Sequence, residues 1–307
     1  MFDLDAVIIG SGPAGVTAGL YLSRAGYRSL VIEKENYGGY LKNIPRVENY
    51  PGFPEGVSGP ELATAMVEQA TKYGLRFEPG EVTGIELYSG ARWVGCTDGK
   101  GYTTGVIIIT GGSQPRKLGI PGEQTLQGNG VFECALCDGG QFQGRVVAVC
   151  GGGEGALTEA LYMARLASKV FIIHRRDQFR GANVLQERVA KEPKVEFVLN
   201  SVVETIEGAE KVESIKIRNV INNDLSNLPV DGILVAIGQE PDTGYLRGII
   251  PLDNEGQVIV NSRMETEVPY ILAAGNIRSS SPKQISAAVG DGAQAGITAQ
   301  RLLQEIQ

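Results

Sequence analysis

The sequence predicts an α/β protein with two Rossmann-like, three-layer nucleotide-binding domains, the second of which is inserted into the first. Two glycine-rich segments carry this prediction, GSGPAG at 10–15 and GGGEGA at 151–156, because each follows an apolar strand and opens a helix-like segment. In addition, apolar segments suited to the first domain return after the second unit, in ILAAGN and a final helix. We therefore expect a discontinuous first domain of residues 1–115 and 244–307, and an inserted domain of residues 116–243.

Charge and hydropathy disfavour several classes of function. The chain has 307 residues, with 28 Lys and Arg against 35 Asp and Glu, which gives a formal net charge of −7. This balance argues against nucleic acid or an anionic membrane as the main partner, because few basic side chains are available to neutralise phosphates. The N-terminal residues lack a basic region before an apolar run, and no segment approaches the roughly 18 apolar residues of a membrane span. We expect a cytoplasmic protein.

A dinucleotide-binding turn is predicted at the start of the chain. The apolar strand AVII precedes Gly10, Gly12 and Gly15, whose G-x-G-x-x-G spacing leads into the helix-like segment VTAGLYLSRAG. Such glycines permit a tight turn, close approach of a pyrophosphate and close packing of helix on strand, with the helix N-terminus facing the phosphate charge. The next apolar strand, SLVIE, ends in Glu33, where an acid accepts hydrogen bonds from a ribose. The alternative is a glycine-rich turn that binds no ligand.

The same unit returns in the middle of the chain with the opposite charge. The strand RVVAVC precedes Gly151, Gly153 and Ala156, and an amphipathic helix and the strand KVFIIH follow. Where the first unit ends in an acid, the second ends in a basic cluster made up of His174, Arg175, Arg176 and Arg180. Arginines attract a 2′-phosphate through charge-assisted hydrogen bonds, whereas an acid would repel it. The two units therefore predict FAD at the first turn and NADPH at the second. A solvated charge cluster is the alternative for the arginines.

A close cysteine pair precedes the second unit. In ECALCDGG, residues 133–140, Cys134 and Cys137 stand two residues apart and Asp138 follows directly. Zinc normally needs four ligands, and the chain has one histidine, so we predict no metal site. Four cysteines in 307 residues are too few for a disulfide-stapled secreted scaffold, and inert core thiols suit neither the acid nor the glycines beside them. A redox-active dithiol is the favoured interpretation.

The motifs together resemble one known family. GSGPAG, VENYPGFPEGVSGPELA, ECALCDGG, GGGEGALTEALYMARLASKVFIIHRRDQFRG, DGILVAIGQEPDT and ILAAGNIRS occur in the order found in low-molecular-weight, FAD-dependent thioredoxin reductases, which are class II pyridine nucleotide-disulphide oxidoreductases. The resemblance covers essentially the whole chain. It implies electron transfer from NADPH through FAD and a Cys134–Cys137 disulfide to the disulfide of thioredoxin or a thioredoxin-like protein. It also implies a homodimer and a rotation of the inserted domain between two orientations.

The resemblance also implies roles for individual residues. Cys134 exchanges with the thioredoxin disulfide, Cys137 exchanges electrons with the flavin, and Asp138 gives and takes the proton that thiolate chemistry requires. Besides Glu33 and the three glycines of the first turn, the implied FAD-binding residues are Pro13, Ala14, Lys34, Gly38, Gly39, Leu41, Asn49, Gly275, Asn276, Lys283, Gln284 and Ile285. At the second turn, Glu154 and Gly155 join the glycines and the basic cluster as NADPH-binding residues.

The chain departs from the family pattern at four places. Asn276 stands where an aspartate is usual, Tyr40 where a glutamine is frequent, Lys283-Gln284-Ile285 where Arg-Gln-Ala is usual, and Glu154-Gly155 where Asp-Ser or Asn-Ser-like pairs are commoner. These departures leave room for a reductase that uses a donor such as ferredoxin. Two other classes also stay open. One is a dithiol oxidase of the same fold; relatives of this kind and ferredoxin-dependent relatives tend to lack the nucleotide-binding arginines. The other is a non-catalytic flavoprotein that senses NADPH or binds a partner, which would have no need for Cys134, Cys137 and Asp138 together.

Overall fold

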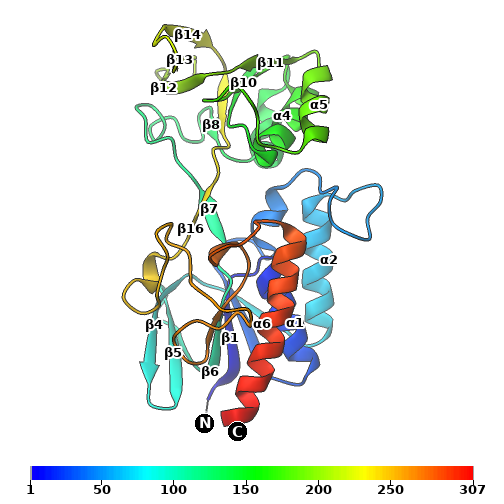
Figure 1. Cartoon of the computed structure of the whole chain (residues 1–307), viewed down its shortest axis with the longest axis vertical. Coiled ribbons are helices and arrows are strands. Elements are labelled where there is room, and N and C mark those ends of the chain that lie inside the picture. The colour runs from blue at the N-terminus through cyan, green and yellow to red at the C-terminus, as the bar shows by residue number, and fades with distance from the viewer. Residues whose placement is uncertain (1, 307) are drawn as a thin grey trace. The chain divides into compact units, whose positions relative to one another are not determined.

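The computed structural model describes residues 2–306 and consists of two compact units (Figure 1). One unit contains the chain up to Gln114 and from Glu240 onwards, and the other contains Pro115–Gln239. The two crossing segments, β7 (Ser113–Pro115) and β16 (Gln239–Pro241), pair with each other as a two-stranded sheet. The first unit resumes four residues earlier than the expected residue 244, because Asp242 binds Lys34 and Gln114 of that unit.

The first unit is built on a seven-stranded sheet in the order β3-β2-β1-β6-β5-β4, with β17 paired to β6. Strands β1, β2, β3, β6 and β17 run parallel, whereas β5 pairs antiparallel with both β4 and β6. The bounds are β1 Leu4–Ile9, β2 Ser29–Glu33, β3 Arg76–Pro79, β4 Val82–Tyr88, β5 Ala91–Cys96, β6 Gly101–Ile109 and β17 Ile271–Ala273.

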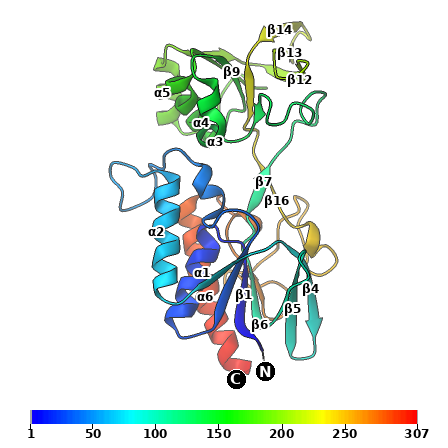
Figure 2. The same cartoon turned by 180° about the vertical axis from the view of Figure 1, so that it is seen from behind.

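Three helices cover one face of this sheet. Helices α1 (Pro13–Arg24), α2 (Gly59–Lys72) and α6 (Ile285–Ile306) lie side by side in both views (Figures 1 and 2). Along β1, Ala6 and Ile8 pack in the core beneath these helices, while Val7 and Ile9 pack in the core on the other face. The alternation explains why the strand is apolar from Ala6 to Ile9: both of its faces are buried there.

The second unit has three layers. Its parallel sheet has the order β11-β10-β9-β15-β8; α4 (Glu154–Leu166) and α5 (Asn183–Lys191) pack on one face. The antiparallel sheet β12-β13-β14 packs on the other face, through a core that includes Ile173, Ile215 and Ile233. The bounds are β8 Val131–Phe132, β9 Val146–Cys150, β10 Lys169–Ile173, β11 Val195–Val198, β12 Ser201–Glu207, β13 Ser214–Asn219, β14 Leu225–Pro229 and β15 Gly232–Val235. The predicted α/β class with Rossmann-like, three-layer domains is confirmed.

Short helices complete the fold. The cysteine segment forms a single helical turn, α3 (Ala135–Asp138), followed by the 3-10 turn η2 (Gly139–Phe142). The other 3-10 turns are η1 (Gly39–Asn43), η3 (Gly244–Leu246) and η4 (Gly275–Ile277). Helix α1 begins at Pro13, three residues before the expected Val16, because proline suits a first helical turn whose N–H groups have no partner inside the helix. Within residues 2–306, no helix is long and apolar enough to cross a membrane.

Candidate active site

The first glycine turn has the geometry that its spacing predicts. Gly10 has φ +99°, and a Cβ at Gly15 would lie 2.0 Å from the Gly10 carbonyl oxygen and 2.5 Å from Thr110 Oγ1. Both positions therefore require glycine, one for its backbone conformation and one for close packing of α1 on the sheet. In contrast, a Cβ at Gly12 would meet nothing within 4 Å. The space over Gly12 suits a phosphate that approaches the backbone at the N-terminus of α1.

Glu33 lies at the end of β2, beside this turn, and organises it. One carboxylate oxygen accepts hydrogen bonds from the Ser11 N–H at 2.8 Å and the Ser11 hydroxyl at 2.7 Å. The other accepts the Glu35 N–H at 3.0 Å. Sequence reasoning assigned Glu33 to a ribose but missed Ser11, which links this acid to the glycine turn. Hydroxyl–carboxylate contacts between residues 22 apart leave no local sequence signal.

The predicted Gly38-Gly39 turn packs against the first glycine turn. The Gly38 N–H donates to both the carbonyl and the hydroxyl oxygens of Ser11, at 3.2 and 3.0 Å. Gly39 has φ +60°, and a Cβ there would lie 2.9 Å from the Cα of Gly12. Leu41 follows in η1 with its side chain buried. The structure therefore brings these predicted residues to one place.

Two more predicted FAD-binding residues, distant in sequence, also meet. The Asn49 amide donates to the Gln284 side-chain oxygen at 2.9 Å, and Ile285 then begins α6. Gly275 approaches the first turn as well, since a Cβ there would lie 2.9 Å from the Cβ of Ala14. Asn276 follows half-buried in η4, whereas Lys283 is exposed.

An unpredicted ion pair holds the segment that carries Gly275 and Asn276. Asp291 of α6 accepts the Gly275 N–H at 3.2 Å and two guanidinium hydrogen bonds from Arg278 at 2.6 and 2.8 Å. The only sequence signal is an acid within the glycine- and alanine-rich segment AAVGDGAQAG. The ammonium group of Lys34, another predicted FAD-binding residue, forms an ion pair with Asp242 at 2.7 Å.

The second glycine turn repeats the first. A Cβ at Gly151 would lie 2.2 Å from the Ala236 carbonyl oxygen and 2.8 Å from the Cβ of Ala156. At Gly153 and Gly155 a Cβ would meet nothing within 4 Å, so the approach to the N-terminus of α4 is open. Glu154 is the first residue of that helix and is exposed. The arrangement fits a second pyrophosphate.

The basic cluster divides into one buried and three exposed side chains. His174 is 5% exposed, its Nε2 lies 3.1 Å from the Gln178 carbonyl oxygen, and its ring occupies the space that a Cβ at Gly152 would need. Burial lowers the pKa of His174, so the ring is neutral at pH 7 and supports the turn from beneath. Arg175, Arg176 and Arg180 are exposed, and within residues 2–306 they form no ion pair. These three guanidinium groups are available to a phosphate.

The cysteine pair forms a disulfide at α3. Cys134 and Cys137 are bonded to each other, with their Cα atoms 5.4 Å apart, and the Cys137 N–H donates to Cys134 Sγ at 3.0 Å. Cys137 is exposed, whereas Cys134 is 7% exposed. The more exposed cysteine is thus not the one that the resemblance assigns to thioredoxin, and the division of roles between the two stays a prediction. Within residues 2–306, no group of three or more His, Cys, Asp or Glu side chains could hold a metal ion.

Asp138 follows the disulfide in an environment that suits proton transfer. Its side chain is exposed at the end of α3, but partial burial of the carboxyl and the nearby charge of Glu133 raise its pKa. Glu133 is itself paired with Lys117. A raised pKa keeps a carboxylic acid protonated closer to neutral pH, where it can give a proton to a departing thiolate.

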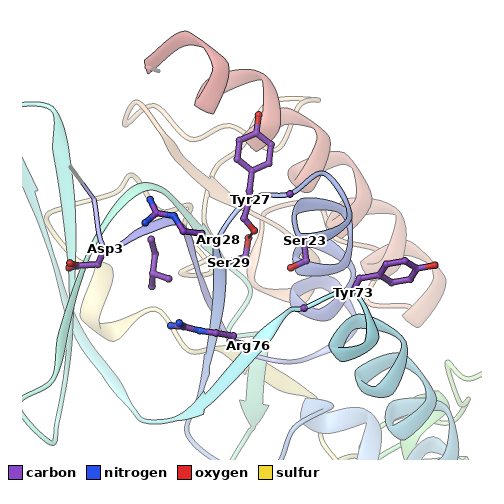
Figure 3. A pocket seen from close by; sticks show the side chains of 10 residues that line it. Asp3, Ser23, Tyr27, Arg28, Ser29, Tyr73 and Arg76 are labelled. Atoms are coloured by element: carbon purple, nitrogen blue, oxygen red, sulfur yellow. Dashed lines mark hydrogen bonds between the residues drawn. The ribbon is translucent and has the colours of Figure 1, made fainter.

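A separate pocket of about 300 Å³ lies at the opposite ends of the strands (Figure 3). Leu4, Ser29 and Arg76, which line it, are the first residues of β1, β2 and β3. In Figure 3 Arg28 also lines this pocket, and it forms an ion pair with Asp5 at 2.8 Å. Nucleotides bind parallel sheets at the carboxyl ends of the strands, so we exclude this pocket from the candidate site.

Two dinucleotide-type turns and a close disulfide define a nucleotide-dependent disulphide oxidoreductase. The family model for pyridine nucleotide-disulphide oxidoreductases matches residues 4–292. The chain belongs to this family.

Named relatives cover the whole chain. The thioredoxin reductase of Listeria innocua is 41% identical over 305 residues, which is 99% of this chain and 95% of that protein. The thioredoxin reductase of Bacillus subtilis is 40% identical over 305 residues, 99% of this chain and 96% of that protein. The crystal structure of Lactococcus lactis thioredoxin reductase matches with a TM-score of 0.96 at 38% identity and covers 99% of this chain and 100% of that chain. The predicted resemblance is confirmed.

Proposed function

We propose that this protein is a thioredoxin reductase, which passes electrons from NADPH through FAD and the Cys134–Cys137 disulfide to the disulfide of thioredoxin or a thioredoxin-like protein. One observation carries the proposal: the disulfide at α3 and a glycine turn lie in the same unit. Beside that turn stand three exposed arginines, which form no ion pair among the described residues. Full-length similarity to thioredoxin reductases supports it.

The first unit would hold FAD. The turn from Gly10 to Gly15 would bind the pyrophosphate through backbone N–H groups, and Glu33 retains acceptor capacity for a ribose beside Ser11. The Asn49–Gln284 pair, and η4 with Asn276, would complete the site. When bound, FAD supplies a carrier that accepts a hydride from a nicotinamide and delivers two electrons to a disulfide.

The second unit would hold NADPH. The open approach at Gly153 and Gly155 would admit the pyrophosphate, while Arg175, Arg176 and Arg180 would bind the 2′-phosphate. His174 would act from beneath the turn rather than on the nucleotide directly, because its ring is buried against Gly152.

The dithiol would carry electrons onward. Following the family resemblance, Cys137 would exchange electrons with FAD and Cys134 would exchange with the partner disulfide, through a mixed disulfide that the second thiolate resolves. Asp138, with its raised pKa, would protonate the departing thiolate and later recover the proton.

The remaining parts of the proposal concern context. The partner is a thioredoxin-type disulfide protein, and the protein acts as a homodimer, as the resemblance implies. We place it in the cytoplasm, because a reaction that delivers reducing equivalents to dithiols suits a reducing compartment.

Two alternatives differ in the source or the destination of the electrons. A dithiol oxidase would pass them to oxygen, and a reductase with another donor, such as ferredoxin, would not need a 2′-phosphate site. The exposed arginines favour NADPH over both.

The test is anaerobic: the purified yellow protein is mixed with NADPH, NADH or reduced ferredoxin, and then with a panel of protein disulfides. We expect the fastest bleaching with NADPH and complete reoxidation by a thioredoxin-type disulfide. Bleaching by ferredoxin alone, or reoxidation by oxygen alone, would refute the proposal.

A further inference from the structure

One carboxyl group beside the disulfide is not used in the proposed reaction. Glu159 lies on the buried face of α4 and is 6% exposed. Its neighbours on that face, Ala156, Ala160 and Met163, belong to the apolar core of the second unit. Burial of a carboxylate in such surroundings is costly unless the group is hydrogen-bonded or protonated. The position therefore needs an explanation in terms of what Glu159 binds.

Glu159 binds the backbone of the disulfide turn. Its Oε2 accepts the N–H of Ala135 at 2.8 Å. Ala135 is the first residue of α3, and the first N–H groups of a helix have no carbonyl partner within it. The Cys137 N–H is satisfied by Cys134 Sγ at 3.0 Å. The Ala135 nitrogen is bonded to the carbonyl carbon of Cys134. The Glu159 carboxyl therefore binds the peptide group that directly follows this cysteine.

We propose that Glu159 is a positioning residue of the Cys134–Cys137 centre: it fixes the first turn of α3, and its charge controls how readily the Cys134 thiol loses its proton after reduction. The inference rests on the proposed redox use of this pair. A neutral carboxyl leaves the thiol unaffected, whereas a carboxylate that is hydrogen-bonded to the peptide after Cys134 disfavours a negative charge on the sulfur of that cysteine. The two groups therefore titrate as a coupled pair.

The proton count of the redox step shows what the charge changes. Reduction breaks the S–S bond and adds two electrons, which the reduced flavin supplies in the proposed reaction. The sulfurs take up two protons when both end as thiols, and one when a sulfur remains a thiolate; an anionic reduced flavin would release one proton with its two electrons, and solvent would supply any other. An ionised Glu159 keeps the Cys134 thiol protonated up to a higher pH, so both protons are taken up over a wider range of pH. It thereby lowers the amount of Cys134 thiolate that is available for exchange at high pH.

Glu159 changes its charge near neutral pH. Burial raises its pKa to about 7, against a smaller opposite effect of the Ala135 hydrogen bond. The carboxyl is thus largely neutral at pH 6 and largely ionised at pH 8. The titratable groups on the other elements packed against α4 are Asp138 of α3, Cys150 of β9, Lys169 of β10, and Glu187, Arg188 and Lys191 of α5. Among the described residues, none of these contributes to the shifted pKa of Glu159.

The test compares Glu159→Gln with the wild type and with Glu187→Gln. Glutamine keeps an oxygen that accepts the Ala135 N–H but cannot ionise. Glu187 is an exposed acid on α5, so the control removes one negative charge from the same unit. Each full-length, FAD-bound protein is reduced anaerobically with dithiothreitol and treated with iodoacetamide between pH 5.5 and 9. The alkylation of Cys134 and Cys137 is followed separately by peptide mass.

The expected result is a difference that depends on pH. At pH 6 the three proteins should react at the same rate, and at pH 8 Cys134 of Glu159→Gln should react about tenfold faster than in the wild type, the scale of one pKa unit. Glu187→Gln should follow the wild type throughout. The deciding quantity is the alkylation rate of Cys134 in Glu159→Gln divided by that in the wild type. If this ratio is the same at pH 6 and pH 8, the proposal is overturned. That holds for a constant ratio of one, and also for a constant ratio above one, which would indicate a general loosening of α3.

Two features keep this test independent of other failures. Alkylation needs neither NADPH nor thioredoxin, so an inactive enzyme with the expected pH profile would refute the proposed function and leave the role of Glu159 standing. If Glu159→Gln does not fold, the wild type alone decides: the alkylation profile of Cys134 should then deviate from a single titration, with an inflection near pH 7. A single titration without that inflection would contradict the coupling.

Discussion

Removal of the two arginines that follow His174 is the sharpest test of nucleotide choice. Arg175 and Arg176 are exposed and lie at the carboxyl end of β10, where the ribose of a bound dinucleotide would stand. The double variant Arg175→Ala, Arg176→Ala should lower kcat/KM for NADPH and leave kcat/KM for NADH unchanged, because NADH has no 2′-phosphate. The variant should retain its fold, since neither side chain is buried.

The magnitude follows from the exposure of the two side chains. A hydrogen bond to a charged group contributes about 1.5–3 kcal/mol, and solvent screening at an exposed site favours the lower end. Two contacts of about 1.5 kcal/mol give about 3 kcal/mol, or roughly a hundredfold change in the ratio of kcat/KM for NADPH over NADH.

The assay is anaerobic stopped-flow reduction of the flavin by each nucleotide, at two salt concentrations. The control, Lys191→Ala with Lys216→Ala, removes two exposed positive charges from the same unit, away from the glycine turn. It should retain the preference for NADPH. A wild type reduced equally fast by both nucleotides, or an unchanged ratio in the arginine variant, would refute this interpretation of the basic cluster.

Three further predictions concern the first turn and the dithiol. Gly15→Val should destabilise the protein by about 3 kcal/mol and release FAD, since its Cβ would lie 2.0 Å from a carbonyl oxygen of the turn. Gly12→Ala should lower the affinity for FAD with little change in the Tm of the apoprotein, because a Cβ there meets nothing. Equal Tm values for the two apoproteins would contradict the packing argument. Asp138→Asn should slow reduction of the disulfide by about 10²-fold. The rate of the wild type should decline as pH rises through the raised pKa of Asp138, and the variant should lack this decline. A pH profile in rapid kinetics that is the same in both proteins would remove Asp138 from proton transfer. Cys137→Ser should trap thioredoxin through a mixed disulfide with Cys134, visible on a non-reducing gel; trapping by Cys134→Ser instead would reverse the two roles and agree with the greater exposure of Cys137.

The fold was predictable because its signals are local. The run from Ala6 to Ile9 is apolar on both faces of a buried strand, and the glycines that follow satisfy backbone conditions within one turn. The same applies to the second unit, so both nucleotide-binding turns could be located without any knowledge of long-range contacts.

The features that local sequence does not indicate depend on contacts between distant residues or on burial. Lys34, a predicted FAD-binding residue, pairs with Asp242, which is 208 residues away, and nothing near Lys34 in the sequence indicates this contact. The sequence places His174 beside three arginines but does not indicate that its ring is buried where Gly152 leaves room for it. Glu159 stands within a predicted amphipathic helix, where an acid on the apolar face is a usable signal.

The most direct test of the account is whether oxidation of NADPH is coupled to reduction of a thioredoxin disulfide through the cysteine pair. NADPH consumption and thioredoxin thiols are measured together, under anaerobic conditions, for the wild type and for Cys134→Ser with Cys137→Ser. We expect one NADPH oxidised for each disulfide reduced in the wild type. The double variant should form no thioredoxin thiols, while NADPH still bleaches its flavin, since hydride transfer requires neither sulfur. Thioredoxin reduction by the double variant, or NADPH oxidation by the wild type without thioredoxin thiols, would contradict the account.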